Sequence, residues 1–189
     1  MKKILSASVV TVLFAGVIAL TSCKKDVTVT VKIADQEHCI SATTANPQYG
    51  FDKTFEILMS DVQTAFSQAG VTFSSEKIKT AKFKNFKLKI GVSSTAINFD
   101  DISGAQVYAK TTPPTTGGAD TELGQQVAYI DNIGNNTQEI TMSLTGLELK
   151  SFLNEAKLYV TIRVYNESAG NDQICIKLTS GVIEIEAQK

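Results

Sequence analysis

Residue types that carry metal or acid–base chemistry are scarce in this chain of 189 residues. His38 is its single histidine and stands between Glu37 and Cys39. Neighbours on an extended chain point to opposite sides, so these three side chains would grip one zinc ion only in a tight turn. The segment 131–136 offers oxygen ligands for calcium without the spacing of an EF-hand loop. We therefore expect no metal site and no cofactor.

Two pairs of carboxylates have the composition that acid–base catalysis requires. Asp100 and Asp101 are adjacent, whereas Glu184 and Glu186 alternate with isoleucines, which is typical of a solvated strand face. No serine stands in a Gly-x-Ser-x-Gly turn, and no glycine-rich loop precedes a helix in a phosphate-binding pattern. The sequence therefore predicts a protein that is not an enzyme.

A binding surface is a stronger candidate than a catalytic centre. Tyr159, Arg163 and Tyr165 share the outer phase of one expected strand, and Tyr108 with Lys110 share that of another. Tyrosine and arginine are enriched in binding hot spots. If the two strands adjoin, these five residues form an aromatic and cationic surface; the alternative is ordinary cross-strand packing of outward tyrosines.

Lysines are concentrated between residues 77 and 89. Such a cluster could bind an anionic glycan or a lipopolysaccharide headgroup. Lysine on an exposed strand also blocks edge-to-edge aggregation, and we favour that explanation. The six lysines are Lys77, Lys79, Lys82, Lys84, Lys87 and Lys89.

The N-terminus has the pattern of a secretory signal, with Lys2 and Lys3 followed by a mostly apolar run over 4–20. The sequence Leu20-Thr21-Ser22-Cys23 resembles the lipobox of Gram-negative bacterial lipoproteins. The resemblance implies cleavage before Cys23 and lipidation of that cysteine, which would fix the protein to a membrane. A plain signal peptide or an anchor helix is the alternative.

The resemblance also bears on location. In that family an aspartate directly after the lipidated cysteine is a signal for retention in the inner membrane, and this chain has Lys24 there. The resemblance therefore favours the outer membrane of the cell envelope. Whether the domain faces the periplasm or the cell surface is left open.

With Cys23 assigned to the lipid, Cys39 and Cys175 remain in a chain expected to be secreted, where disulfides persist. Cys175 falls on the outer phase of an expected strand. A partner must then come from a segment lying over the outside of the sheet, and Cys39 lies in the irregular stretch 34–50. We predict a disulfide between them.

Composition and periodicity set the fold expected to position these residues. The chain is 43% hydrophobic and 20% charged with a net charge of −1, which excludes a mainly disordered chain and gives no indication of nucleic-acid binding. Its length beyond the signal suits one domain. We expect a signal peptide over 1–22, a lipidated tether over 23–26 and a single domain over 27–189.

Alternation of apolar and polar residues predicts an all-β domain, an antiparallel β-sandwich that is immunoglobulin-like in outline. A break in phase predicts a β-bulge at Lys84 and Asn85, and a second break leaves Gly181 as either a bend in one strand or a hairpin turn. The longest irregular stretch is 111–124. The predicted strands cover 27–33, 55–59, 77–90, 105–110, 125–131, 140–144, 158–165 and 174–179, with 183–186 as either a continuation of the last strand or a ninth one.

Helix is expected in one place, over 60–69, where Ser60 and Gln63 match a capping box and Gly70 follows as a stop. A shorter turn is expected over 149–153. The order of these elements is similar to that of uncharacterised β-sandwich lipoproteins of Gram-negative envelopes, a group that brings no catalytic residues.

The leading hypothesis is a non-enzymatic, outer-membrane lipoprotein with a binding or structural role in the envelope and an unidentified ligand. One alternative is a glycan-capturing accessory lipoprotein of a nutrient-uptake system, favoured if the outward tyrosines cluster beside the 111–124 loop and disfavoured by the absence of tryptophan. Another is a fimbrial or adhesin subunit, which would need a strand to donate. The expected partner is the membrane, with a glycan or an envelope protein as further candidates and no nucleic acid; the oligomeric state is open.

Overall fold

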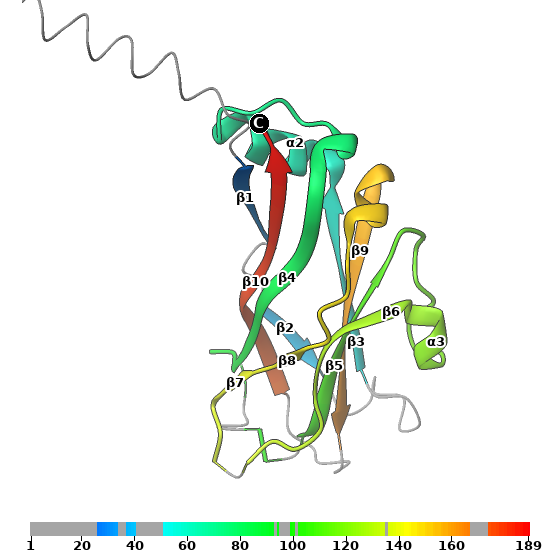
Figure 1. Ribbon diagram of the computed structural model, residues 1–189. Coiled ribbons are helices and arrows are strands. Elements are labelled where there is room, and N and C mark those ends of the chain that lie inside the picture. Colours follow the sequence, from blue (N-terminus) through cyan, green and yellow to red (C-terminus); the bar gives the residue numbers. More distant parts are fainter. Residues whose placement is uncertain are drawn as a thin grey trace, which may run out of the picture.

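A computed structural model describes the domain in two packed β-sheets (Figure 1). The described residues are 26–33, 37–40, 51–92, 94, 99–100, 102–134, 136–166 and 174–189. The predicted signal peptide, Cys23 and Asp101 lie outside them, and so does the side chain of His38.

Each sheet contains five antiparallel strands. The first, here called the β4 sheet, has the order β1-β10-β4-β7, and β2 pairs with β10. Its strands are β1 (Asp26–Lys32), β2 (Glu37–Ile40), β4 (Ile78–Ile90), β7 (Glu139–Thr141) and β10 (Ile174–Gln188). The second, the β5 sheet, has the order β3-β9-β5-β6-β8. Its strands are β3 (Phe51–Leu58), β5 (Ile102–Lys110), β6 (Gln125–Ile130), β8 (Ser143–Leu144) and β9 (Lys157–Asn166).

The strand pairs are nested along the chain. β1 pairs with β10, β3 with β9, β4 with β7 and β5 with β6, as if one long hairpin had been folded over into two sheets. Nested antiparallel pairing across two sheets is the connectivity of a jelly roll. The predicted all-β sandwich is confirmed. The immunoglobulin-like outline does not extend to the strand order, because the successive strands β3, β4 and β5 alternate between the sheets.

Both breaks in the apolar pattern correspond to irregularities in the pairing of β4 with β10. Asn85 pairs with Val182 and Phe83 with Ile183, so Lys84 is the extra residue of the predicted bulge. A second shift lies next to Thr179, between Leu178 and Ser180. Gly181 bends one continuous strand and does not turn a hairpin. A side chain there would meet Ile33, whose Cδ1 lies 3.1 Å from the position of a Cβ at Gly181.

The core fills the space between the sheets with the inner-facing side chains of both. Phe86, Leu88, Ile183 and Ile185 contribute from the β4 sheet, and each is fully buried. Val107, Val160 and Leu158 are among those from the β5 sheet. This two-residue period of buried positions is the pattern from which the strands were predicted.

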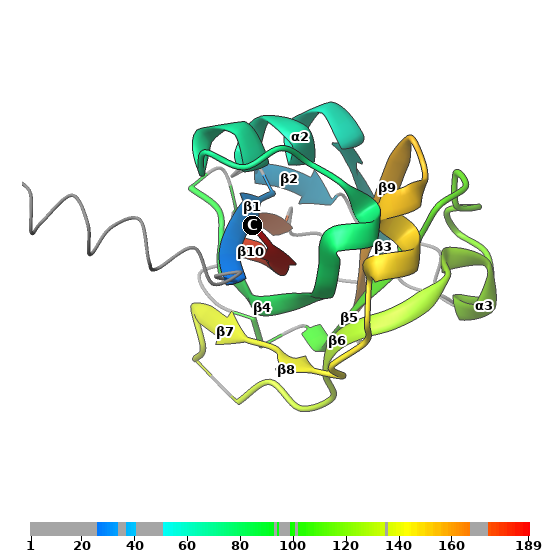
Figure 2. The same ribbon diagram turned by 45° about the horizontal axis from the view of Figure 1, so that its top comes forward.

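Helix α2 (Met59–Gln68) covers one end of the sandwich, as Figure 2 shows, and buries Val62 and Phe66. The predicted helix is confirmed, but its predicted capping box is wrong. β3 continues directly into the helix, so Leu58 is the N-cap residue and no side chain caps the first turn. The other helical segments are η1 (Ser75–Lys77), α3 (Asp120–Leu123) and η2 (Lys150–Asn154), of which η2 matches the turn expected over 149–153. None of the described helices has the length and apolar composition needed to cross a membrane.

The predicted disulfide is confirmed: Cys39 and Cys175 are bonded, with Cα atoms 3.8 Å apart. The expected arrangement around it was wrong. Residues 37–40 do not lie over the outside of the sheet but form the short strand β2, in which Cys39 stands directly opposite Cys175 of β10. Cys175 is fully buried as a result.

Replacing both Cys39 and Cys175 by alanine should lower the free energy of unfolding by about 2–4 kcal/mol, because the cross-link restricts the unfolded chain. Urea denaturation measures this loss. The unmodified protein treated with a reductant is the matched control and should show the same loss. Two reactive thiols in the denatured, unreduced protein would contradict the disulfide.

Candidate binding sites

The strands that carry the predicted aromatic and cationic surface are neighbours. β5 pairs with β9, which places Lys110 opposite Tyr159 and Tyr108 opposite Thr161. Arg163 nevertheless is fully buried, and Tyr108 is 4% exposed. These two side chains are therefore not contact residues on the surface of the domain, although they lie on the outer face of the β5 sheet.

A buried ion pair accounts for the position of Arg163. Its Nε lies 2.6 Å from Oδ1 of Asp52, and its Nη2 lies 2.7 Å from Oδ2 of the same carboxylate. Asp52 stands directly opposite Arg163 in the pairing of β3 with β9, and its side chain is 2% exposed. Nη1 of Arg163 also donates to Oδ1 of Asp120, at 2.6 Å. The guanidinium is thus held by two carboxylates, one of them in a bidentate pair.

Two tyrosine hydroxyls complete this group. Those of Tyr108 and Tyr165 both donate to the side-chain oxygen of Gln106. The Tyr165 hydroxyl also lies 3.2 and 3.3 Å from the two carboxylate oxygens of Asp120. We call this set, which consists of Asp52, Gln106, Tyr108, Asp120, Arg163 and Tyr165, the Arg163 cluster.

The electrostatics of the cluster follow from its burial. Burial alone lowers the pKa of the Arg163 guanidinium, but the hydrogen bonds and charges of Asp52 and Asp120 outweigh it and raise that pKa above its usual value. Burial raises the pKa of Tyr108, and the neighbouring Tyr165 and Asp120 raise it further. Burial also raises the pKa of Tyr165. Both phenols are therefore held in the neutral form.

The cluster fixes the 111–124 segment over the outer face of the β5 sheet. Asp120 belongs to α3 in that segment, and the backbone N–H of Gly117 donates to Oδ2 of Asp52 at 2.7 Å. Gly124 ends the segment at φ +116°, where a Cβ would lie 2.3 Å from the carbonyl oxygen of Ala109. The outward tyrosines Tyr108 and Tyr165 thus cluster beneath this loop.

A shallow pocket of about 360 Å³ lies where the 111–124 loop meets the end of β5 and η2. Lys110 and Gln125 are among its polar lining residues, and Phe152 is its aromatic one. Lys110 donates to the carbonyl oxygen of Glu122 at 3.0 Å. We call this pocket the loop hollow. Its described lining is Ala109, Lys110, Thr111, Gly124, Gln125, Ser151, Phe152 and Glu155.

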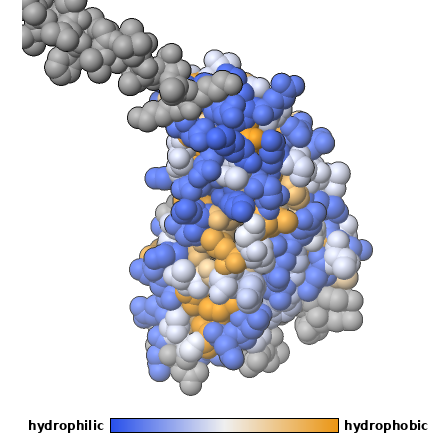
Figure 3. Space-filling view, in the orientation of Figure 1, coloured by the Kyte–Doolittle hydropathy of each residue, from blue (hydrophilic) through white to orange (hydrophobic). Residues whose placement is uncertain are grey.

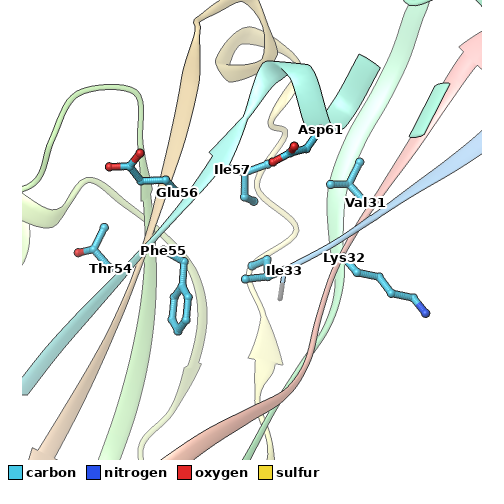
Figure 4. Close-up of a pocket in the computed structure, with 8 residues that line it drawn as sticks. All are labelled: Val31, Lys32, Ile33, Thr54, Phe55, Glu56, Ile57 and Asp61. Carbon is cyan, nitrogen blue, oxygen red and sulfur yellow. The ribbon is translucent and has the colours of Figure 1, made fainter. Parts of the chain in front are cut away.

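A second pocket lies between the edges of the two sheets, and we call it the inter-sheet cleft (Figure 4). It has a volume of about 380 Å³. Its described lining is Val31, Lys32, Ile33, Thr54, Phe55, Glu56, Ile57 and Asp61. Sequence reasoning did not find it, because the pattern that predicts β1 and β3 does not say that they form the two edges on one side of the sandwich.

The lysines of β4 lie among acidic side chains. Lys79 pairs with Asp26 at 2.7 Å, Lys84 with Glu184 at 2.9 Å, and Lys87 lies 3.6 Å from a carboxylate oxygen of Glu139. A hydrogen bond and the charge of Glu184 raise the pKa of Lys84. Figure 3 shows hydrophilic residues over the upper part of the face that carries β4. β7 pairs with β4 only at residues 87–89, so Lys79 and Lys84 lie on a stretch of β4 that β7 does not cover. Edge protection and ion pairing across strands are therefore both compatible with these lysines.

The groups considered for metal or acid–base chemistry are engaged in other interactions. Carboxylate and sulfur atoms of Glu37, Cys39 and Cys175 approach within 4.8 Å, but the two sulfurs are bonded to each other and are not thiolate ligands. Glu184 pairs with Lys84, and Glu186 accepts from Thr80 at 3.4 Å. In the turn at 131–136, the backbone N–H of Asn136 donates to Asp100 at 2.6 Å.

Comparisons with known proteins do not identify a family. No family model matches the chain, and no curated protein matches it. Among solved structures, a chain titled Desmodium yellow mottle tymovirus covers 88% of this chain over 89% of its own, with 14% identity and a TM-score of 0.29. A chain from the structure of Mud crab tombus-like virus covers 93% over 98% of its own, with 11% identity and a TM-score of 0.28. Likenesses this loose carry no argument about this chain.

Arg163→Met should lower the free energy of unfolding by about 3–5 kcal/mol, because it leaves the buried Asp52 carboxylate without its counter-charge. The matched control is Lys157→Met. Lys157 and Glu56 join the same two strands at 2.7 Å, but both side chains are more than 40% exposed, so the expected loss is much smaller than in Arg163→Met. Equal losses in the two variants, measured by urea denaturation, would contradict the role given to Arg163.

The raised pKa values of Tyr108 and Tyr165 predict a loss of stability in alkali. Since both pKa values are higher in the folded protein than the usual value near 10, the neutral phenols stabilise the fold fully below about pH 10. That contribution is lost as the pH rises through the folded-state pKa values. The double variant Tyr108→Phe, Tyr165→Phe should show a weaker fall in melting temperature above pH 10. Tyr129→Phe, at an exposed position, is the control.

Proposed function

We propose that the protein is a lipid-anchored lipoprotein of the outer membrane with a non-enzymatic binding or structural role in the cell envelope. The observation that carries the proposal is the sequence Leu20-Thr21-Ser22-Cys23 at the end of an apolar run. The fold is compatible with it, because the first strand begins at Asp26, three positions after Cys23. Three Cα steps reach at most about 11 Å, so the tether would hold the domain close to the bilayer.

This attachment would also orient the domain. Asp26 stands opposite Gln188 in the pairing of β1 with β10, so the end of β1 to which the tether would be joined lies beside the C-terminus (Figure 1). α2 covers that same end (Figure 2). The turn at 131–136 lies at the opposite end and would point away from the membrane.

A binding role is supported by the two pockets and by the pairing of charged groups elsewhere. The exposed carboxylates Glu56 and Glu184 are both engaged with lysines, at 2.7 and 2.9 Å. Carboxylates held in such ion pairs are typical of a stable outer surface. A pair of carboxylates that transfers protons would instead be directed at a substrate.

A glycan-capturing accessory lipoprotein is a second candidate, favoured by one observation. The outward tyrosines do cluster beside the 111–124 loop, and the loop hollow lies next to them. The aromatic rings there are partly or largely covered, however: Phe152 is 8% exposed, Tyr108 is 4% exposed, and Tyr165 is half-buried. Stacking on a sugar would need a more exposed ring, so this candidate ranks below the general binding role.

A fimbrial or adhesin subunit is the third candidate. Its N-terminal strand would have to leave the domain to be donated. β1 is paired with β10 along all seven of its residues, from Asp26 to Lys32, and donation would break that pairing. We rank this candidate last.

Cys23→Ala tests the anchor. The variant should lose the lipid, and it should either appear in the soluble fraction or keep an uncleaved signal. Membrane fractionation with incorporation of a labelled fatty acid measures both. Cys39→Ala removes a cysteine outside the lipobox and is the matched control, which should stay lipidated. Full membrane partitioning of Cys23→Ala after signal cleavage would overturn the proposal.

A further inference from the structure

The two long sides of the sandwich differ. On one side β7 and β8 are the outer strands of the two sheets, and Met142 alone separates them along the chain, so the sheets are joined there. On the other side β1 and β2 are the outer strands of the β4 sheet, β3 is that of the β5 sheet, and among the described residues no strand continues either sheet. α2 contacts both β1 and β3 at one end. The inter-sheet cleft occupies this side, beneath α2.

Four apolar side chains line the cleft, together with polar and charged ones. Val31 and Ile33 face it from the β4 sheet, and Phe55 and Ile57 face it from the β5 sheet (Figure 4). Each of these four is 5–8% exposed, so each is nearly buried without a ligand. The volume of about 380 Å³ falls within the usual range for small-molecule sites, and it corresponds to roughly a dozen water-sized groups.

One charged group closes the α2 end of the cleft. Asp61, in the first turn of α2, lies at the rim above Ile57 (Figure 4). No described residue forms a hydrogen bond or ion pair with its carboxylate. The other charged residues of the lining differ: the side chains of Glu56 and Lys32 point away from the cleft, and Glu56 is paired with Lys157.

The opposite sign of charge lies near the other end. Nζ of Lys53 is 5.9 Å from the centre of the Phe55 ring, and Phe55 is one of the residues that line the cleft. Lys53 is not among the described residues that line the cleft, so Asp61 is the charged group that a ligand between the walls meets.

We propose that the inter-sheet cleft binds a small organic monoamine. Its ammonium group pairs with Asp61, and its apolar body lies among Ile33, Phe55 and Ile57. The charge complementarity at Asp61 selects a cation, and the apolar walls select an unbranched or ring-shaped hydrocarbon body. The inference names a ligand class for the proposed binding role and so rests on it, but its test is independent of the lipid on Cys23.

Hexylamine is a suitable probe, with hexanoate and hexamethylenediamine as matched compounds of the same chain length. The mature protein is held in phosphatidylcholine nanodiscs, and isothermal titration calorimetry is corrected with empty nanodiscs. We expect saturable binding of hexylamine. We expect weaker binding of hexanoate, which Asp61 repels, and of the diamine, whose second ammonium would lie among the apolar side chains without a counter-charge.

Variants assign the binding to the cleft. Val31→Phe and Ile57→Phe each fill the cleft and should abolish saturation while thermal unfolding remains cooperative. Asp61→Asn should weaken binding by about two- to fivefold, as expected for a partly exposed ion pair. Glu56→Gln removes a carboxylate on the outer face of β3 and is the matched control, which should bind as the unaltered protein does.

The proposal is overturned if hexylamine shows no saturable binding, if hexanoate binds equally well, or if Asp61→Asn and Glu56→Gln bind alike. It is also overturned if Val31→Phe or Ile57→Phe folds cooperatively and still binds hexylamine. If the phenylalanine variants do not fold, the comparison of Asp61→Asn with Glu56→Gln decides alone. If the protein is lipidated but does not bind hexylamine, the proposed ligand is wrong and the proposed lipid anchor is unaffected. If the protein binds hexylamine but is not lipidated, the lipid anchor is wrong and the proposed ligand is unaffected.

Discussion

The buried pair between Arg163 and Asp52 is the interaction on which the outer half of the molecule depends. A fully buried guanidinium is tolerated only where its donors are satisfied, and here two carboxylates accept from it. One lies on the neighbouring strand β3 and the other on α3. The charge of Arg163 on β9 therefore fixes both the start of the edge strand β3 and the 111–124 loop, which follows β5.

The consequences of this pair reach both pockets. By holding Asp120 and the N–H of Gly117, the Arg163 cluster keeps the 111–124 segment against the β5 sheet, and that segment forms one side of the loop hollow. By holding Asp52, it ties the start of β3 to β9, and Lys157 with Glu56 ties the other end. β3 is one wall of the inter-sheet cleft, so the Arg163 pair adds to the backbone pairing of β3 with β9 that holds this wall in place.

Periodicity predicted the strands well because their inner faces are buried and their outer faces are not. The bulge at Lys84 was also predictable, since a phase slip in the sequence has only a few structural causes. The Arg163 cluster was only partly predictable. The outer phase and adjacency of its strands followed from the pattern, but Asp52 and Asp120 are far from Arg163 in the chain. Only the register of β3 against β9, and the path of a loop without periodicity, bring them together.

The inter-sheet cleft was not predictable from the sequence for the same reason, because strands far apart in the chain form its walls. The position of the cleft also bears on how the protein would meet a ligand. Nested pairing puts the first strand and the third on one side of the sandwich, and no local pattern encodes that pairing. β1 also carries the proposed tether, so one strand would connect the membrane to a wall of the cleft. Val31 lies five residues from Asp26, roughly 17 Å along a strand. The cleft would then lie close to the bilayer surface, where an amine with an apolar body is concentrated by partitioning into the interface.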